Sequence, residues 1–144
     1  MKIEEILELW KADAEIDRTE IGDEAMKTAK LHHKYFQILV GERMILRNHE
    51  ADMKKLKLEK YEFFTQGPNE ETQAKGWKLP AKGLILKSDI PMYMEADDQI
   101  VKLSLRVGLQ QEKIALLESI INMIVYRGNN LKVALEWQKF VNGS

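Results

Sequence analysis

No proline interrupts the chain between Met1 and Gly67, so nothing in that stretch forces a helix to end. Bulky and mostly apolar residues recur along it at alternating steps of four and three, which is an imperfect heptad pattern. The pattern predicts one long helix from about Thr19 to Phe64. A helix of this length does not fold back on itself, so it must pack against another helix or another subunit. The repeating positions are Ile21, Ala25, Thr28, His32, Tyr35, Leu39, Glu42, Leu46, His49, Met53, Leu56, Lys60 and Phe63.

A shorter helix is predicted before the long one, from Lys2 to about Ala14, because apolar residues recur there at three- and four-residue steps. Glu4 and Glu5 lie near its start, where the helix dipole favours negative charge. Polar residues around Asp17 can then cap the long helix.

The central part of the chain changes character. Gly67-Pro68-Asn69 is strong turn chemistry, and further glycines and prolines follow, so residues 65–83 are predicted to be a loop. Two short apolar segments around Pro91, Leu84–Leu86 and Met92–Met94, are predicted to be extended. Residues 65–96 as a whole are interpreted as a linker.

A third helix is predicted from Asp97, a good capping residue, to about Arg127. Residues 127–130, Arg-Gly-Asn-Asn, are expected to end it and to start a short fourth helix from Leu131 to about Val141. A seam with steps of three and four runs through Ile100, Leu103, Val107, Gln110, Ile114, Leu117, Ile121 and Ile124. A second apolar strip beside it contains Val101, Leu105, Leu109, Leu116, Ile120 and Met123.

A helix that is apolar over so much of its surface is buried between several neighbours. It either closes a bundle within one chain or lines an interface between subunits, and the small number of helices favours the interface. The residues predicted to carry oligomerisation are Ile100, Leu103, Val107, Ile114, Leu117, Ile121 and Ile124.

The predicted fold class is therefore all-α: a short N-terminal helix, a long basic helix, a central loop and C-terminal helices. Three regions follow: a helical region over 1–64, the linker over 65–96 and a C-terminal helical region over 97–144. Apolar residues make up 44% of the chain, which argues against disorder. The acidic, amphipathic N-terminus is unlike a signal peptide, and no apolar run is long enough to span a membrane.

Enzyme signatures are nearly absent. The chain has no cysteine, no glycine-rich phosphate loop, no HExxH and no G-x-S-x-G motif. His32 and His33 are adjacent and would diverge by about 100° on a helix, so they do not readily share a metal ion. We expect a protein that is not an enzyme, with no catalytic residue, no metal and no cofactor.

The charge is banded, although the net charge is only −1. Residues 1–26 are acidic, whereas residues 27–60 carry nine basic and four acidic residues, a net charge of +5. The basic band ends in lysines interleaved with aromatic residues. Ammonium groups neutralise phosphates and aromatic rings stack on unpaired bases, so this pattern predicts binding of single-stranded nucleic acid. The predicted DNA-binding residues are Lys54, Lys55, Lys57, Lys60, Tyr61 and Phe64.

The alternative interpretation of the same segment is a solvated basic face, with Phe63 and Phe64 as ordinary core residues. Four lysines on one protomer would bind weakly in either case. Repetition of the segment around an oligomer would multiply their effect.

The order of these parts resembles the UvsY family of recombination mediators from T-even-like phages. The resemblance includes an acidic first helix, the junction Ile16-Asp17-Arg18-Thr19, the basic segment from Lys57 to Phe64 ending at Gly67, and Tyr126-Arg127-Gly128 before an amphipathic C-terminal helix. It spans most of the chain and depends on colinearity, because no single motif is a fingerprint. The central loop is the poorest match.

The resemblance implies an all-α protomer in a ring-shaped homo-oligomer of about six or seven subunits. It implies binding to single-stranded DNA, a RecA-like recombinase and a single-strand-binding protein, in the cytoplasm of the bacterial host and with no membrane. The family's DNA contacts include two basic residues separated by one position, before an aromatic pair. Lys60 matches the second, Leu58 occupies the first, and Phe63 with Phe64 forms the pair.

Two hypotheses of different kinds follow. The first is a recombination mediator that binds single-stranded DNA and promotes recombinase loading in recombination, repair and replication. The second is a helical scaffold or adaptor that binds only proteins, with its basic helix docked on an acidic surface. A titration with an oligonucleotide separates them, because a pure adaptor ignores the oligonucleotide.

Overall fold

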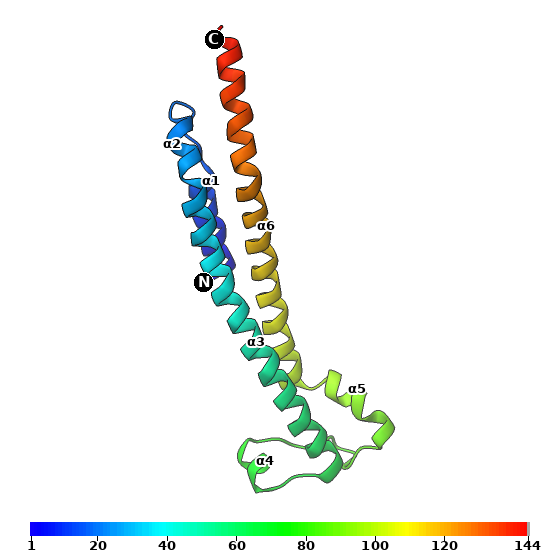
Figure 1. Cartoon of the computed structure of the whole chain (residues 1–144). Helices are drawn as coiled ribbons and strands as arrows, with labels where there is room; N and C mark the ends of the chain where they lie inside the picture. Colours follow the sequence, from blue (N-terminus) through cyan, green and yellow to red (C-terminus); the bar gives the residue numbers. More distant parts are fainter. Residues whose placement is uncertain (144) are drawn as a thin grey trace. The chain divides into compact units, whose positions relative to one another are not determined.

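The structure is a computed structural model that describes residues 1–143, and within these residues it contains helices and loops but no strand. The helices follow one another in chain order as shown in Figure 1. They are α1 (Ile3–Ala14), α2 (Ile21–Met26), α3 (Thr28–Gln66), α4 (Glu70–Ala74), the 3-10 helix η1 (Lys87–Asp89), α5 (Ile90–Glu95) and α6 (Asp98–Val141). The all-α fold class predicted from the sequence is confirmed.

The chain forms two compact units, which do not follow the predicted three-part order. Unit 1 combines Met1–Met44 with the residues from Gln110 onwards, and unit 2 consists of Ile45–Leu109. Both α3 and α6 contribute to each unit, because their sequences extend across the division.

The predicted long helix from Thr19 to Phe64 is present with one interruption. It begins at Ile21, is broken at Lys27 into α2 and α3, and ends at Gln66. Lys27 keeps a helical backbone, with φ −74° and ψ −16°. The end follows from Gly67, whose φ of +84° suits glycine and whose N–H donates to the carbonyl of Phe63 at 2.9 Å.

The predicted break over residues 127–130 is wrong, because α6 continues without interruption to Val141. Glycine inside a helix costs only about 1 kcal/mol, and Gly128 is flanked by two buried side chains that hold the helix in place. These are Arg127, which pairs with α2, and Leu131. The expected start of the helix is confirmed: a carboxylate oxygen of Asp97 accepts the N–H groups of Gln99 and Ile100, each at 3.1 Å.

The central segment is more helical than predicted. Met92–Met94 lie in α5, so the extended conformation expected for them is wrong; Pro91 sits in the first turn of α5, where it needs no hydrogen-bond donor. The loop expected over 65–83 is present but contains α4. Asn69 and Thr72 cap α4 reciprocally, each accepting the other's backbone N–H at 2.8 Å.

The core of unit 1 is made largely by the two predicted seams, which bury most of their large side chains within one protomer, whereas the predicted seam residues Ala25 and His32 are exposed. From α2 and α3 these are Ile21, Tyr35 and Leu39, and from α6 they are Ile114, Leu117 and Ile124. The first helix adds Ile6, and Trp10 packs edge-on against Tyr35 with ring centroids 5.4 Å apart.

Two polar pairs are buried in this core between α6 and the N-terminal helices. Arg127 donates to the carboxylate of Glu24 at 2.7 Å, to the Glu24 carbonyl at 2.6 Å and to Thr28 Oγ1 at 2.9 Å. The hydrogen bond from Lys27 holds the pKa of Glu24 below its usual range despite burial, and Arg127 lowers it further. Glu24 is therefore ionised in the folded protein at neutral pH.

The second pair joins the middle of α3 to α6. Gln110 donates to both the carbonyl and the carboxylate of Glu42, and the amino group of Met1 lies 3.1 Å from the same carboxylate. Burial alone would raise the pKa of Glu42, but these hydrogen bonds outweigh it and lower the pKa.

Loss of Arg127 should destabilise unit 1. Arg127→Met leaves the buried Glu24 carboxylate without its partner on α6, so we expect the free energy of unfolding to fall by about 3 kcal/mol. Urea unfolding at fixed protein concentration measures this change. The matched control, Arg106→Met, removes an exposed arginine of the same helix and should change stability by less than about 0.5 kcal/mol. Equal stability of the two variants would contradict the assignment.

Candidate nucleic-acid interface

The aromatic residues of the basic segment lie in the core of unit 2. Phe63 and Phe64 are 3% and 5% exposed and cluster with Trp77 and Ile90. Trp77 reaches this core because Gly76 adopts a φ of +77° after α4, and the Trp77 N–H then donates to the carbonyl of Thr72 at 3.1 Å. Phe64, predicted to stack on DNA bases, is therefore packed inside the protomer.

Lys60 is also packed inside unit 2, although it was predicted to contact DNA. Its side chain is 6% exposed, and its Nζ lies 3.0 Å from Oδ1 of Asp97 and 3.9 Å from the centre of the Trp77 ring. The other oxygen of Asp97 caps α6. Lys60 thus links the end of α3, the loop after α4 and the start of α6, and its charge is already neutralised by Asp97.

Three predicted lysines remain on the surface of α3. Lys54, Lys55 and Lys57 are exposed, and none has an ion-pair partner among residues 1–143. Tyr61, one turn beyond Lys57, is 41% exposed. Leu58, which occupies the family's first basic position, is exposed as well. These side chains form an accessible cationic face with one aromatic ring, and we call Lys54, Lys55 and Lys57 the lysine cluster.

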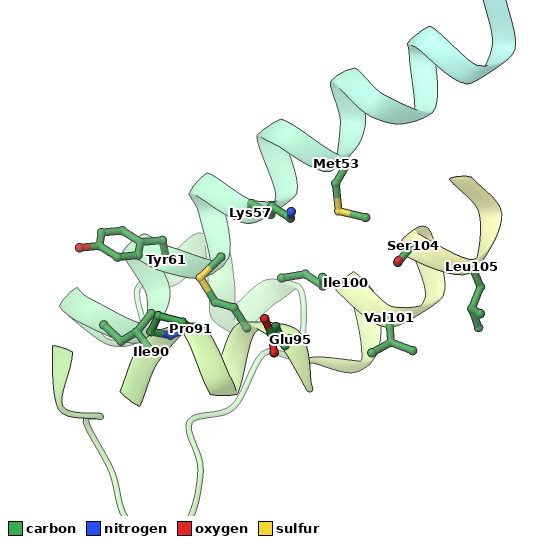
Figure 2. A pocket seen from close by; sticks show the side chains of 11 residues that line it. Met53, Lys57, Tyr61, Ile90, Pro91, Glu95, Ile100, Val101, Ser104 and Leu105 are labelled. Carbon is green, nitrogen blue, oxygen red and sulfur yellow. The ribbon is translucent and has the colours of Figure 1, made fainter. Parts of the chain in front are cut away.

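Lys57, one member of the lysine cluster, lines an open, largely apolar groove of about 480 Å³ within unit 2. The side chains that line it come from three helices, α3, α5 and α6, as Figure 2 shows. They are Met53, Lys57, Tyr61, Ile90, Pro91, Met94, Glu95, Ile100, Val101, Ser104 and Leu105. The structure therefore brings Lys57 and Tyr61 together on one wall of a groove.

Sequence reasoning did not find the groove. Its α5 wall comes from the segment expected to be extended, and α6 contributes Val101 and Leu105, two residues of the second apolar strip. The second apolar strip could have indicated it. Apolar residues beyond those that pack the helix against its neighbour often mark a binding surface.

The residues predicted to carry oligomerisation already have partners inside the protomer. Ile100, Ile114, Leu117 and Ile124 are buried, whereas Leu103, Val107 and Ile121 are half-buried. Exposed apolar side chains of α6 in unit 1 lie elsewhere and include a run with steps of three, seven, four and three, in which Asn130 occupies the position skipped by the step of seven. This run, which we call the outer seam, contains Met123, Tyr126, Val133, Trp137 and Phe140, all more than half exposed.

The part of the chain that the structure describes has neither a metal-binding cluster nor a membrane-spanning helix. No group of three or more His, Asp or Glu side chains is arranged to hold a metal ion within residues 1–143. None of the helices over this range is long and apolar enough to cross a membrane.

These features define a class: an all-helical protein that has an exposed lysine in the lining of an apolar groove and an exposed apolar seam on its longest helix. The family model described as "Recombination, repair and ssDNA binding protein UvsY" matches residues 9–144. The chain belongs to the UvsY family.

Solved structures agree on the fold. Two crystal structures of the bacteriophage T4 recombination mediator protein UvsY superpose with TM-scores of 0.81 and 0.80, at 20% and 17% sequence identity. The first alignment covers 99% of this chain and 98% of that one, and the second covers 97% and 98%. A third crystal form gives a TM-score of 0.79 at 18% identity, over 94% and 98% of the two chains. No curated protein matches.

The structural role of Lys60 separates it from the exposed lysines. Lys60→Met removes a buried ion pair, so we expect the free energy of unfolding to fall by about 2–3 kcal/mol. Lys57→Met is the matched control, because it shortens an exposed lysine one turn earlier and should change stability by less than about 0.5 kcal/mol. Urea unfolding of both variants at equal concentration tests the difference. A Lys60→Met variant as stable as the wild type would show that the pair with Asp97 does not hold unit 2 together.

Proposed function

We propose that the chain is a recombination mediator that binds single-stranded DNA through the lysine cluster and helps to load a RecA-like recombinase onto DNA covered by single-strand-binding protein. Family membership over residues 9–144 supports the general role. The observation that carries the site is the lysine cluster, three cations with no ion-pair partner among the described residues. Such lysines can neutralise phosphates without first breaking an internal bond.

Three lysines per protomer bind a strand weakly, so the proposal requires assembly. The outer seam supports it, because a soluble monomer rarely exposes five large apolar side chains along one helix face. A closed ring formed by this face would place the lysine clusters of all protomers on one continuous DNA path. The proposal moves the subunit contacts from the α6 residues predicted to carry oligomerisation, which run from Ile100 to Ile124, to the outer seam.

The mechanism is non-enzymatic. Many weak contacts hold the strand in an extended path, which weakens the grip of the competing binding protein and offers the strand to the recombinase. No covalent bond is made or broken, so no catalytic residue, metal or cofactor is assigned. ATP hydrolysis in the pathway belongs to the recombinase. The same activity would serve recombination, repair and replication.

Removal of the lysine cluster should weaken DNA binding. For the triple variant Lys54→Ala/Lys55→Ala/Lys57→Ala we expect at least a tenfold loss of affinity for a labelled single-stranded oligonucleotide at low salt. The slope of log K against log salt should also fall by about 2, because each phosphate contact on a single strand contributes about 0.7. Fluorescence anisotropy at several salt concentrations measures both quantities.

The matched control removes three other exposed lysines, Lys11, Lys30 and Lys132, and so makes the same change in net charge. It should retain nearly all affinity. If both triple variants lost the same affinity for DNA, binding would depend on the net charge of the protein and not on the lysine cluster. A wild-type protein that ignores the oligonucleotide at low salt would favour the scaffold that binds only proteins.

Charges on the outer seam should prevent assembly. Val133 and Phe140 are 57% and 75% exposed, so Val133→Glu/Phe140→Glu should leave the protomer folded but place unpaired carboxylates in the subunit contact. Sedimentation velocity should show the wild type as an oligomer and this variant as a smaller species. Asn129→Glu/Lys132→Glu, on the neighbouring strip of the same helix, is the control and should stay assembled. A monomeric wild type would overturn the requirement for assembly.

A further inference from the structure

The lysine cluster accounts for phosphates but leaves the bases of a bound strand without a contact. Phe63 and Phe64, the aromatic pair that was expected to stack on them, belong to the core of unit 2. Tyr61 is the aromatic ring on α3 that is both exposed and next to Lys57. Both residues line the groove shown in Figure 2. A strand held at the lysine cluster therefore has its bases beside this groove.

The groove has the chemistry that an unpaired base needs. Its volume of about 480 Å³ lies in the usual range for small-molecule sites, and most of its lining is apolar. Met53, Met94 and Ile100 offer the apolar surface that the flat faces of a base require. Methionine in particular adapts to differently shaped ligands, which suits binding that does not depend on sequence.

Besides Lys57, three residues with polar side chains contribute to the lining: Tyr61, Ser104 and Glu95. A base that enters with its faces against apolar side chains still has polar edges to satisfy. These groups can donate to or accept from such edges. The groove thus combines apolar walls and a few polar groups with one lysine, Lys57, in its lining.

We propose that this groove receives an unpaired nucleobase of the bound strand while the lysine cluster holds the adjoining phosphates. The inference rests on the proposed function, because it assumes that single-stranded DNA is the ligand. The favoured occupant is a nucleic acid strand rather than a protein helix because Lys57, which has no ion pair within residues 1–143, lines the groove, and the exposed Lys54 lies about one turn before it on α3. They complement a polyanion that carries apolar bases.

Glu95 adds a preference to this binding. Its carboxylate can accept hydrogen bonds but cannot donate them. Cytosine and adenine carry exocyclic amino groups that donate, whereas thymine has a carbonyl oxygen at the corresponding position. The groove should therefore hold cytosine or adenine better than thymine, and Glu95→Gln, which adds a donor, should reduce the difference.

A test fills the groove without removing a charge. Ser104→Phe places a ring in the groove, and Ser88→Phe makes the same substitution at an exposed position of η1 outside it. Each variant is titrated by fluorescence anisotropy with an oligo(dC) strand and with a backbone of equal length that lacks bases. We expect Ser104→Phe to lose about tenfold affinity for oligo(dC) and none for the abasic strand. Ser88→Phe should match the wild type on both.

The outcomes separate the groove from the proposed function. A wild type that binds neither strand at low salt rejects the function itself. A wild type that binds both strands equally would overturn the proposal that the groove receives a base. A Ser104→Phe variant that keeps full affinity for oligo(dC) would overturn it as well. Neither result would contradict phosphate binding by the lysine cluster. Unchanged DNA binding together with lost binding to the recombinase would assign the groove to a protein partner, which also overturns the inference.

A second measurement covers the case in which Ser104→Phe does not fold. Wild-type protein is photocrosslinked to an oligonucleotide containing 5-iododeoxycytidine, and the attached peptides are identified by mass spectrometry. Crosslinks at Tyr61 or Met94 are expected. Crosslinks found only at residues outside the groove would overturn the inference.

Discussion

The buried ion pair between Lys60 and Asp97 determines which part of the basic helix remains available for function. A buried lysine is costly unless it is paired, and here it is paired and also covered by the Trp77 ring. The same contact holds the capping residue of α6 against α3, and both of these helices contribute side chains to the groove. With Lys60 turned inward, the preceding turns of α3 present Lys54 and Lys57 outward. The interaction that stabilises unit 2 thus also shapes the surface that we assign to DNA.

Buried polar pairs play a comparable part in unit 1. Leucine and isoleucine contacts along a heptad seam tolerate a shift of one repeat, whereas a buried carboxylate tolerates only the alignment that supplies its donor. Glu24 with Arg127 and Glu42 with Gln110 satisfy each other at one alignment of α6. Their contribution is therefore to specify how the helices pair, more than to add net stability.

The sequence predicted the fold well where the structure depends on a repeating pattern. The three-four spacing identified the packed face of α3, including Glu42 and Lys60, and that of α6, including Gln110. The sequence predicted the structure less well where a residue's role depends on contacts with residues far away in the sequence. The charge of Lys60 pointed to DNA because nothing near it in the sequence reveals Asp97 or Trp77. Likewise, Gly128 looked like a helix end because the partner of Arg127 lies on α2, and the groove needs α5, whose helical state the sequence pattern missed.

The two apolar strips of α6 link the fold to the proposed activity. The seam that includes Ile114, Leu117 and Ile124 packs inside the protomer. The outer seam remains exposed among the described residues. Burial of its large side chains, such as Trp137 and Phe140, can therefore still contribute free energy to association. Assembly is what weak DNA contacts require, because the second and later clusters bind a strand that is already held nearby. An arrangement with more lysines per protomer would bind a strand without assembly but would release it less readily. Under the proposed function, a cluster of only three lysines, repeated around an oligomer, therefore suits a protein that hands its DNA to another.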